Sequence, residues 1–299
     1  MTRHRIFLLA ILLLAAGLRL PGLANGSPPG LAHDEVANWL IDHGILAGEH
    51  AVYFTRAYGH EAGFHYLQAG FVALLGDHAL ALRLPAAFLG MLLVAVGGAL
   101  ARRLYGRFHA LTAAALLAVL LWPVFFSRLG LRAISLPVLA GLSALFWWWA
   151  WDGHGARSGK RGAIGPAPRF ALAGALAGLS LHTYMAARAV PIFYALWLAY
   201  LLLFDRPALR ARWRGVALFW LLLALTAAPL AVYLLSNPGA EFRIAEVDAP
   251  LRALRSGDPR PVFENALRIL GGFGVRGDPL WRQNVAGRPV FDPLLAVAV

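Results

Sequence analysis

Long apolar runs, separated by short polar or Gly- and Pro-rich segments, dominate the pattern of this chain. Each run is close to the ~20 residues with which a helix crosses a bilayer. None shows the alternation of a membrane β-strand, and helices satisfy their own backbone in lipid. The pattern therefore predicts an all-α polytopic membrane protein of about seven spans, over Ile6–Leu20, Leu84–Ala101, Ala110–Phe126, Ala133–Trp151, Phe170–Ala187, Ala189–Phe204 and Gly215–Leu235.

Composition supports a membrane environment and narrows the chemistry. Hydrophobic residues make up 60% of the 299 residues and charged residues 14%, with a mean hydropathy of +0.63. Soluble domains average about 45–50% apolar and about 25% charged residues. The absence of cysteine excludes disulfides and thiolate metal sites. Within the spans, the small residues of Gly174–Gly178 predict close helix packing.

The distribution of basic residues predicts the orientation. With the N-terminus in the cytoplasm, thirteen Lys and Arg fall in the N-terminus and the cytoplasmic loops, against Asp152 and Asp205 alone. This is the positive-inside pattern of a plasma-membrane protein, so the net charge of +12 is a topology signal and no nucleic-acid partner is expected. The basic residues are Arg3, Arg5, Arg102, Arg103, Arg107, Arg157, Lys160, Arg161, Arg169, Arg206, Arg210, Arg212 and Arg214.

Two further segments define the expected domains. Ala62–Gly76 is short and contains His65 and Gln68, and counting it as a span would break the charge alternation. We expect it to lie in the outer interface as an amphipathic helix. The domains are then 1–235, the membrane domain with its first outer loop 21–83; 236–290, a second outer segment; and 291–299, the start of an eighth, truncated span. The alternative, that Ile6–Leu18 is a cleaved signal peptide, is disfavoured by the six further spans.

An acidic pair opens an amphipathic pattern in the first outer loop. Asp34 and Glu35 precede apolar residues at helical spacing, which predicts a short interfacial helix. One interpretation is structural, with Asp34 as N-cap and Glu35 complementing the helix dipole. The other is catalytic, with a carboxylate at the outer membrane boundary acting as general base. The two are compatible, because a capped carboxylate has a fixed direction.

Outer arginines form a second group of candidates. Arg128 and Arg132 are four residues apart between two spans, and Arg188 lies in another outer loop after His182 and Tyr184. Each could simply extend toward lipid headgroups. Three outer arginines run against the positive-inside bias, however, and guanidinium groups bind phosphate in a bidentate manner. We therefore expect the three to converge on one outer cavity.

A divalent metal site is a weaker hypothesis. Histidines and acidic residues are frequent in the first outer loop and could bind a metal, but their spacing matches no known ligand pattern. They are His33, His43, His50, His60, His65, Asp34, Glu35 and Glu61.

Several motifs resemble the GT-C glycosyltransferases, especially family 39 and its bacterial relatives. His33-Asp34-Glu35 stands where the family has an Asp-Glu motif. Ala81–Ala87 resembles the family's Arg-Leu-Pro-Ser-Ala opening of the second span, and Ala101–Gly106 resembles its Ala-Arg-Arg-Leu-Phe-Gly ending. Phe126–Gly130 resembles the Ser-Arg turn after the third span. The resemblance covers about residues 1–150.

Two departures limit the resemblance. Many relatives have an acidic residue after the Ser-Arg turn, where Arg132–Pro137 has none. The Lys-Pro-Pro element of the lipid A aminoarabinose transferase is also absent. Gly59-His60-Glu61-Ala62 stands near its place, so we expect His60 and Glu61 among the substrate-binding residues.

The resemblance implies a GT-C-like bundle that transfers a sugar on the outer face, as the protein O-mannosyltransferases do. The donor would be a polyprenyl-phosphate sugar and the acceptor a lipid, glycan or protein. Asp34 would be the base of an inverting transfer, Glu35 would orient Asp34 or the acceptor, and outer arginines would stabilise the departing phosphate. The alternatives are a transporter or flippase of lipid-linked saccharides and a non-catalytic membrane subunit.

Overall fold

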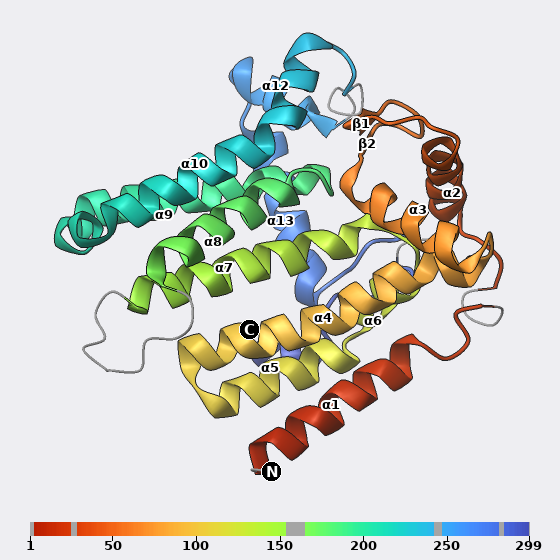
Figure 1. Ribbon diagram of the computed structural model, residues 1–299, viewed down its shortest axis with the longest axis horizontal. Helices are drawn as coiled ribbons and strands as arrows, with labels where there is room; N and C mark the ends of the chain where they lie inside the picture. Colours follow the sequence, from red (N-terminus) through yellow and green to blue (C-terminus); the bar gives the residue numbers. More distant parts are fainter. Residues whose placement is uncertain (1–2, 25–28, 154–164, 242–246, 281–283, 299) are drawn as a thin grey trace.

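The computed structural model describes residues 3–24, 29–153, 165–241, 247–280 and 284–298 as a bundle of long helices with a smaller cap at one end (Figure 1). The N-terminal half contains α1 (Arg3–Arg19), α2 (His33–Leu46), β1 (Tyr53–Phe54), β2 (His60–Glu61), α3 (Gly63–Leu75), α4 (Ala79–Tyr105), α5 (Arg107–Val119), α6 (Leu121–Arg128), η1 (Arg132–Ile134) and α7 (Ser135–Gly153). The C-terminal half contains α8 (Pro166–Ser180), η2 (Met185–Arg188), α9 (Ala189–Phe204), α10 (Arg206–Ser236), α12 (Ala249–Arg255), α13 (Arg260–Gly274) and α14 (Pro293–Ala298).

All seven apolar runs are mainly helical, but not all are complete spans, and the helix of the run Phe170–Ala187 ends at Ser180. In the part of the chain that the structure describes, four units are long and apolar enough to cross a membrane: α4, η1 with α7, η2 with α9, and α10. Helices α1 and α8 have only 17 and 15 residues. A 15-residue helix rises about 22 Å, which is short of the ~30 Å hydrocarbon core. The count of seven spans is therefore not confirmed.

The run predicted as one span over Ala110–Phe126 is broken. Helices α5 and α6 meet at Leu120 with a bend of 54°, and Leu120 has the extended dihedrals φ −60° and ψ 141°. Pro123 lies at the third position of α6. It has no N–H to continue the helical ladder, and its ring would clash with the carbonyl of Val119. A uniform apolar pattern hid this break.

Aromatic side chains and glycines join α7, α8, α9 and α10 in the largest core cluster. Trp147, Phe170 and Phe219 are buried against one another. A Cβ on Gly174 would lie 2.1 Å from the carbonyl oxygen of Phe219, and one on Gly178 would lie 1.9 Å from Thr226 Oγ1. The predicted close packing of the Gly174–Gly178 segment is thus confirmed, against α10.

The two ends of the bundle differ in chemistry. Basic residues gather at one end, where Arg169 and Arg212 donate to the carbonyls of Trp149 and Trp151 near the end of α7. At the other end lie α2, α3 and the β1–β2 hairpin (Figure 1). Arg169 and Arg212, which charge alternation assigned to one side, therefore lie at one end of the bundle, whereas Arg157, Lys160 and Arg161 lie outside the described residues.

Helices are present where the sequence predicted interfacial ones, and the described part of 236–290 contains α12 and α13. Helix α3 is the expected helix of Ala62–Gly76, and its buried residues Phe64, Gln68 and Val72 follow one face. Within 236–290, α13 carries an exposed apolar stripe that includes Phe263, Leu267 and Leu270. In 291–299, Phe291 bonds back to α13 through its backbone.

Candidate functional site

The β1–β2 hairpin supplies the first part of the candidate site. Glu61 pairs with Tyr53 across the hairpin. The connecting turn needs left-handed backbone, with φ values of 51° at Ala57, 69° at Tyr58 and 84° at Gly59. A Cβ on Gly59 would lie 2.1 Å from the Tyr53 hydroxyl oxygen, so only glycine fits. The all-α expectation missed this turn, which places Glu61 next to Tyr53.

The carboxylate of Glu35 is buried and fully used by the protein itself. Its Oε1 accepts from Arg83 Nε at 2.7 Å and from the Gly130 N–H at 2.9 Å. Its Oε2 accepts from Arg83 Nη2 at 2.8 Å and from the Ala32 N–H at 2.9 Å. The side chains of Glu35 and Arg83 are 0% exposed. Four bonds satisfy this buried charge, as a buried ion pair requires.

The same network fixes the backbone just before Arg132. Asn38 Nδ2 donates to the Gly130 carbonyl at 2.6 Å, and Gln68 Nε2 donates to the Leu82 carbonyl at 2.6 Å. A Cβ on Gly130 would lie 2.8 Å from the Leu82 carbonyl oxygen. Contacts with α2, α3 and α4 therefore fix the position of Gly130. They also fix the direction in which the backbone continues toward Arg132.

Asp34, the predicted general base, lies on the open side of α2. It is not the N-cap, as one interpretation had it, because Ala32 occupies that position in extended backbone. Its side chain is about half exposed, and Oδ1 lies 3.2 Å from His33 Nδ1. The neighbouring Glu35 anchors this first helical turn, so Asp34 extends from a fixed backbone.

Glu61 and Arg132 form a second buried pair with much looser contacts. Glu61 Oε2 lies 3.5 Å from Arg132 Nη1, and among the described residues this oxygen has no hydrogen-bond partner. Both terminal nitrogens of Arg132 donate to the Gly59 carbonyl at 3.4 Å. The guanidinium carbon lies 5.6 Å from the centroid of the Tyr184 ring. Sequence reasoning named these three side chains, and the structure brings them together.

Tyrosines complete the cluster. The rings of Tyr53 and Tyr233 lie 6.0 Å apart. Burial raises the pKa of Tyr53, the charge of Glu61 raises it further, and Arg132 and Arg188 act in the opposite direction. Arg132 and Arg188, two of the three arginines predicted to bind phosphate, thus influence the pKa of Tyr53, as Glu61 does.

The remaining predicted ligands have structural contacts. Arg188 pairs with Glu241. The expected convergence of three arginines is not seen, because Arg128 instead donates to backbone carbonyls at the end of α1, those of Leu18, Arg19 and Pro21. His182 joins two elements, since its carbonyl accepts from the Gly63 N–H at 2.7 Å and its ring Nε2 lies 2.7 Å from the Thr226 carbonyl oxygen.

A buried chain of titratable groups runs behind the hairpin. Asp42 Oδ1 lies 3.3 Å from His65 Nδ1, and His65 Nε2 lies 3.0 Å from His60 Nδ1. Burial raises the pKa of Asp42 to about 8. Burial, and then the charge of Arg132, lower the pKa of His65 to about 3. Both shifts favour the neutral forms of Asp42 and His65, as expected for two buried groups in contact.

The structure does not gather the proposed metal ligands. Over the described ranges, no group of three or more His, Asp or Glu side chains is arranged to hold a metal ion. His43 Nε2 lies 3.2 Å from Asp77 Oδ2, His50 stacks on Tyr66, and His33 contacts Asp34.

Sequence reasoning missed several residues of this end as site residues, among them Tyr53, Tyr233, Asp42 and Arg83. The tyrosines and Asp42 carried no motif. Arg83 stood inside a quoted motif, and a charged residue at the start of an apolar run was the available signal, because intramembrane charges need partners.

Comparisons with known proteins bear on the fold. No family model and no curated protein matches the sequence. The structure resembles that of the Archaeoglobus fulgidus oligosaccharyltransferase AglB in complex with an inhibitory peptide and a dolichol-phosphate, with a TM-score of 0.56 and 18% identity over 90% of this chain. The apo form gives 0.54 at 18% identity over 91% of this chain, and a complex with Zn and sulfate gives 0.53 at 18% identity over 89%.

This chain spans 37–39% of the length of those oligosaccharyltransferases. At this identity the likeness shows a common fold. This chain therefore shares the fold of part of these oligosaccharyltransferases over most of its own length.

Proposed function

We propose that this chain is part of a membrane glycosyltransferase that moves a sugar from a polyprenyl-phosphate donor to an acceptor on the extracytoplasmic face. The observation that carries the proposal is the loose Glu61–Arg132 pair, buried at the cap end of a bundle that shares the fold of part of these oligosaccharyltransferases. A buried ion pair with unmade hydrogen bonds is costly for stability alone. A phosphate at this place would offer Arg132 the bidentate oxygens that guanidinium groups bind most strongly.

Arg132 and Arg188 are assigned to the donor phosphate. The ring of Tyr184 and the Gly59 carbonyl contact the Arg132 guanidinium, and its Nη1 lies 3.5 Å from Glu61, so the group is held at the place where a phosphate would meet it. We assign Arg128 to structure, because backbone carbonyls already occupy both of its terminal nitrogens. His182 and His60 position α3, α10 and the hairpin around the cluster.

Transfer needs one base and a stabilised leaving group. Asp34 removes the acceptor proton while the acceptor oxygen forms a bond to the anomeric carbon. The bond from that carbon to the phosphate oxygen breaks on the opposite side, so the configuration inverts. Arg132 and Arg188 stabilise the charge that develops on the phosphate. Glu35 touches neither partner and acts through the backbone position of Asp34.

The test measures binding of polyprenyl phosphate, with polyprenol as the uncharged probe, to the purified full chain in detergent. Arg132→Lys keeps the charge but loses the planar fork. We expect it to weaken polyprenyl-phosphate binding about tenfold, the size of one strong charge-assisted hydrogen bond, without changing polyprenol binding.

Arg56→Lys is the matched control, because Arg56 pairs with Glu49 on the exposed surface of the same outer loop. It should leave both affinities unchanged. Equal binding of polyprenol and polyprenyl phosphate to the wild-type chain, or equal effects of the two substitutions, would contradict the assignment of Arg132.

A further inference from the structure

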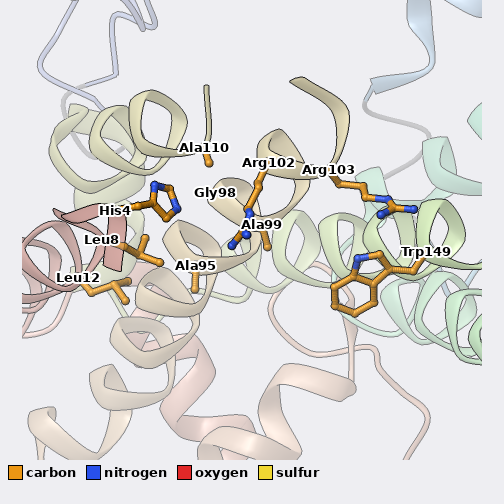
Figure 2. Close-up of a pocket in the computed structure, with 10 residues that line it drawn as sticks. All are labelled: His4, Leu8, Leu12, Ala95, Gly98, Ala99, Arg102, Arg103, Ala110 and Trp149. Atoms are coloured by element: carbon orange, nitrogen blue, oxygen red, sulfur yellow. The ribbon is translucent and has the colours of Figure 1, made fainter. Parts of the chain in front are cut away.

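A second site lies at the basic end of the bundle, at the other end from the Glu61–Arg132 cluster. It is a half-open cavity of about 380 Å³ between α1, α4, α5 and α7 (Figure 2). Ligand pockets are typically about 300–1,000 Å³, so the cavity is large enough for part of a lipid. It is lined by His4, Leu8, Leu12, Ala95, Gly98, Ala99, Arg102, Arg103, Ala110 and Trp149.

Two helix faces form the walls. On α1 the lining residues His4, Leu8 and Leu12 recur every four residues, and on α4 the lining runs from Ala95 to Arg102. Each wall spans about 10–12 Å along the helix axis. Each is apolar toward the middle of the bundle and carries a nitrogen-bearing side chain toward the basic end. The cavity therefore has the polarity of a lipid, with a polar mouth and an apolar floor.

The helices close below the cavity. Ala15, Val94 and Ala114 are each 0% exposed and pack together where α1, α4 and α5 meet. Near the basic end the same helices leave room, because the residues of α4 and α5 that face the cavity are small, including Ala99 and Ala110. The cavity is thus a groove that ends blindly in a close-packed core.

Two side chains at the mouth of the groove, His4 and Arg102, could donate hydrogen bonds to a ligand. Arg103 pairs with Asp152. Arg102 and His4, by contrast, make no side-chain hydrogen bond or ion pair with any part of the chain that the structure describes. Figure 2 shows His4, Arg102 and Arg103 on one side of the cavity and Leu12 and Ala95 on the other. Trp149 borders the groove, as aromatic side chains do at membrane interfaces.

We propose that this groove binds one anionic phospholipid of the leaflet at the basic end, with its phosphate on Arg102 and His4 and an acyl chain along Leu8 and Leu12. Basic pockets between membrane helices hold anionic headgroups in this way. The apolar floor makes a lipid a better occupant than a free anion, since an apolar groove exposed at a mouth gains from acyl burial. The site is separate from the proposed transfer reaction.

Native mass spectrometry of the purified full chain in detergent tests the proposal, with phosphatidylglycerol and phosphatidylcholine of identical acyl chains as probes. We expect one tight phosphatidylglycerol adduct. Arg102→Ala should weaken it about fivefold, as expected for one basic contact to an anionic headgroup. Ala99→Leu fills the groove without removing charge and should weaken binding of both lipids.

Arg107→Ala is the matched control, because Arg107 begins α5 at the same end but does not line the cavity. It should change binding less than twofold. Equal loss in Arg102→Ala and Arg107→Ala would show general attraction to a basic face and overturn the site. Equal binding of the two lipids, or displacement of phosphatidylglycerol by millimolar inorganic phosphate, would overturn the lipid assignment. Thermal unfolding of each variant in the same detergent, without added lipid, separates these outcomes from misfolding.

Discussion

Two glutamate–arginine pairs are buried at the same end of this bundle, and they are built differently. Glu35 has four hydrogen bonds, two of them from Arg83. Glu61 reaches Arg132 only at 3.5 Å and leaves one oxygen without a hydrogen bond among the described residues. A complete network stabilises a fold, whereas an incomplete one is a cost that ligand binding can offset. Residue type alone does not distinguish the two.

The largest expected effect is loss of stability on breaking the complete pair. Glu35→Gln leaves the buried Arg83 without its counter-charge, and breaking such a pair costs about 3–5 kcal/mol. Thermal unfolding in detergent measures the change. Glu49→Gln, at an exposed pair with Arg56, should cost about 0–1 kcal/mol. A Glu35→Gln protein as stable as wild type would mean that the pair is not structural.

The residue next to Glu35 should give the opposite result. Asp34 is exposed, so Asp34→Asn should leave the unfolding temperature nearly unchanged. If Asp34 is the general base, transfer from a polyprenyl-phosphate sugar should fall by about 10²-fold or more. Transfer that survives in Asp34→Asn would remove Asp34 from the mechanism and leave the acidic pair as a purely structural feature.

The buried Asp42–His65 contact predicts a pH dependence of stability. Asp42 releases its proton near pH 3.8 when unfolded but near pH 8 when folded, so the unfolded chain binds fewer protons in between and stability falls as pH rises. The pKa of His65 is lowered from 6.5 to about 3. Between these values the unfolded chain binds more protons at His65, so this group makes stability rise with pH up to pH 6.5. Only the Asp42 effect remains above that, worth about 2 kcal/mol between pH 6.5 and 8.

Thermal unfolding across that pH range, in wild type and in Asp42→Asn, checks this dependence. The substitution should flatten the curve, because the amide does not titrate. Asp77→Asn is the control, since Asp77 pairs with His43 at the surface, and the slope should persist there. A wild-type curve that is flat or rising from pH 6.5 to 8 would mean that Asp42 ionises normally.

The smallest effect concerns the incomplete pair. Glu61→Gln removes a negative charge beside the proposed phosphate site and frees Arg132 from its counter-charge. Polyprenyl phosphate should then bind about fivefold more tightly, a fraction of the like-charge repulsion expected at ~5 Å in a partly buried site. Affinity measurements in the full chain, with Glu49→Gln as control, would detect the change. Weaker binding would show that Glu61 supports the phosphate site and does not compete with it.

Much of the architecture could be predicted from the sequence, because membrane helices depend on local sequence. The apolar runs predicted the helices, and Arg169 and Arg212, which charge alternation assigned to one side, lie at one end of the bundle. The break at Leu120 escaped prediction, since Pro123 is tolerated inside many membrane helices. Whether α1 and α8 span the membrane was equally hidden, because hydropathy does not fix where a short helix ends.

Only part of the candidate site could be predicted from the sequence. Sequence reasoning named Asp34, Glu35, Glu61 and Arg132 from residue type, position and family resemblance. It could not tell which carboxylate would be saturated by hydrogen bonds. That outcome depends on Gly130, a residue 95 positions from Glu35 in sequence.

The sequence by itself determined the helices, the basic end and the acidic and basic residues of the cap, because each follows from hydrophobicity, charge or residue chemistry within a short window. Tertiary structure alone decided that Glu35 meets Arg83 and that Glu61 faces Arg132. It also decided that Arg128 is held by the end of α1. Partners of a buried charge are chosen by which helices pack together, and that packing joins segments that no local pattern relates.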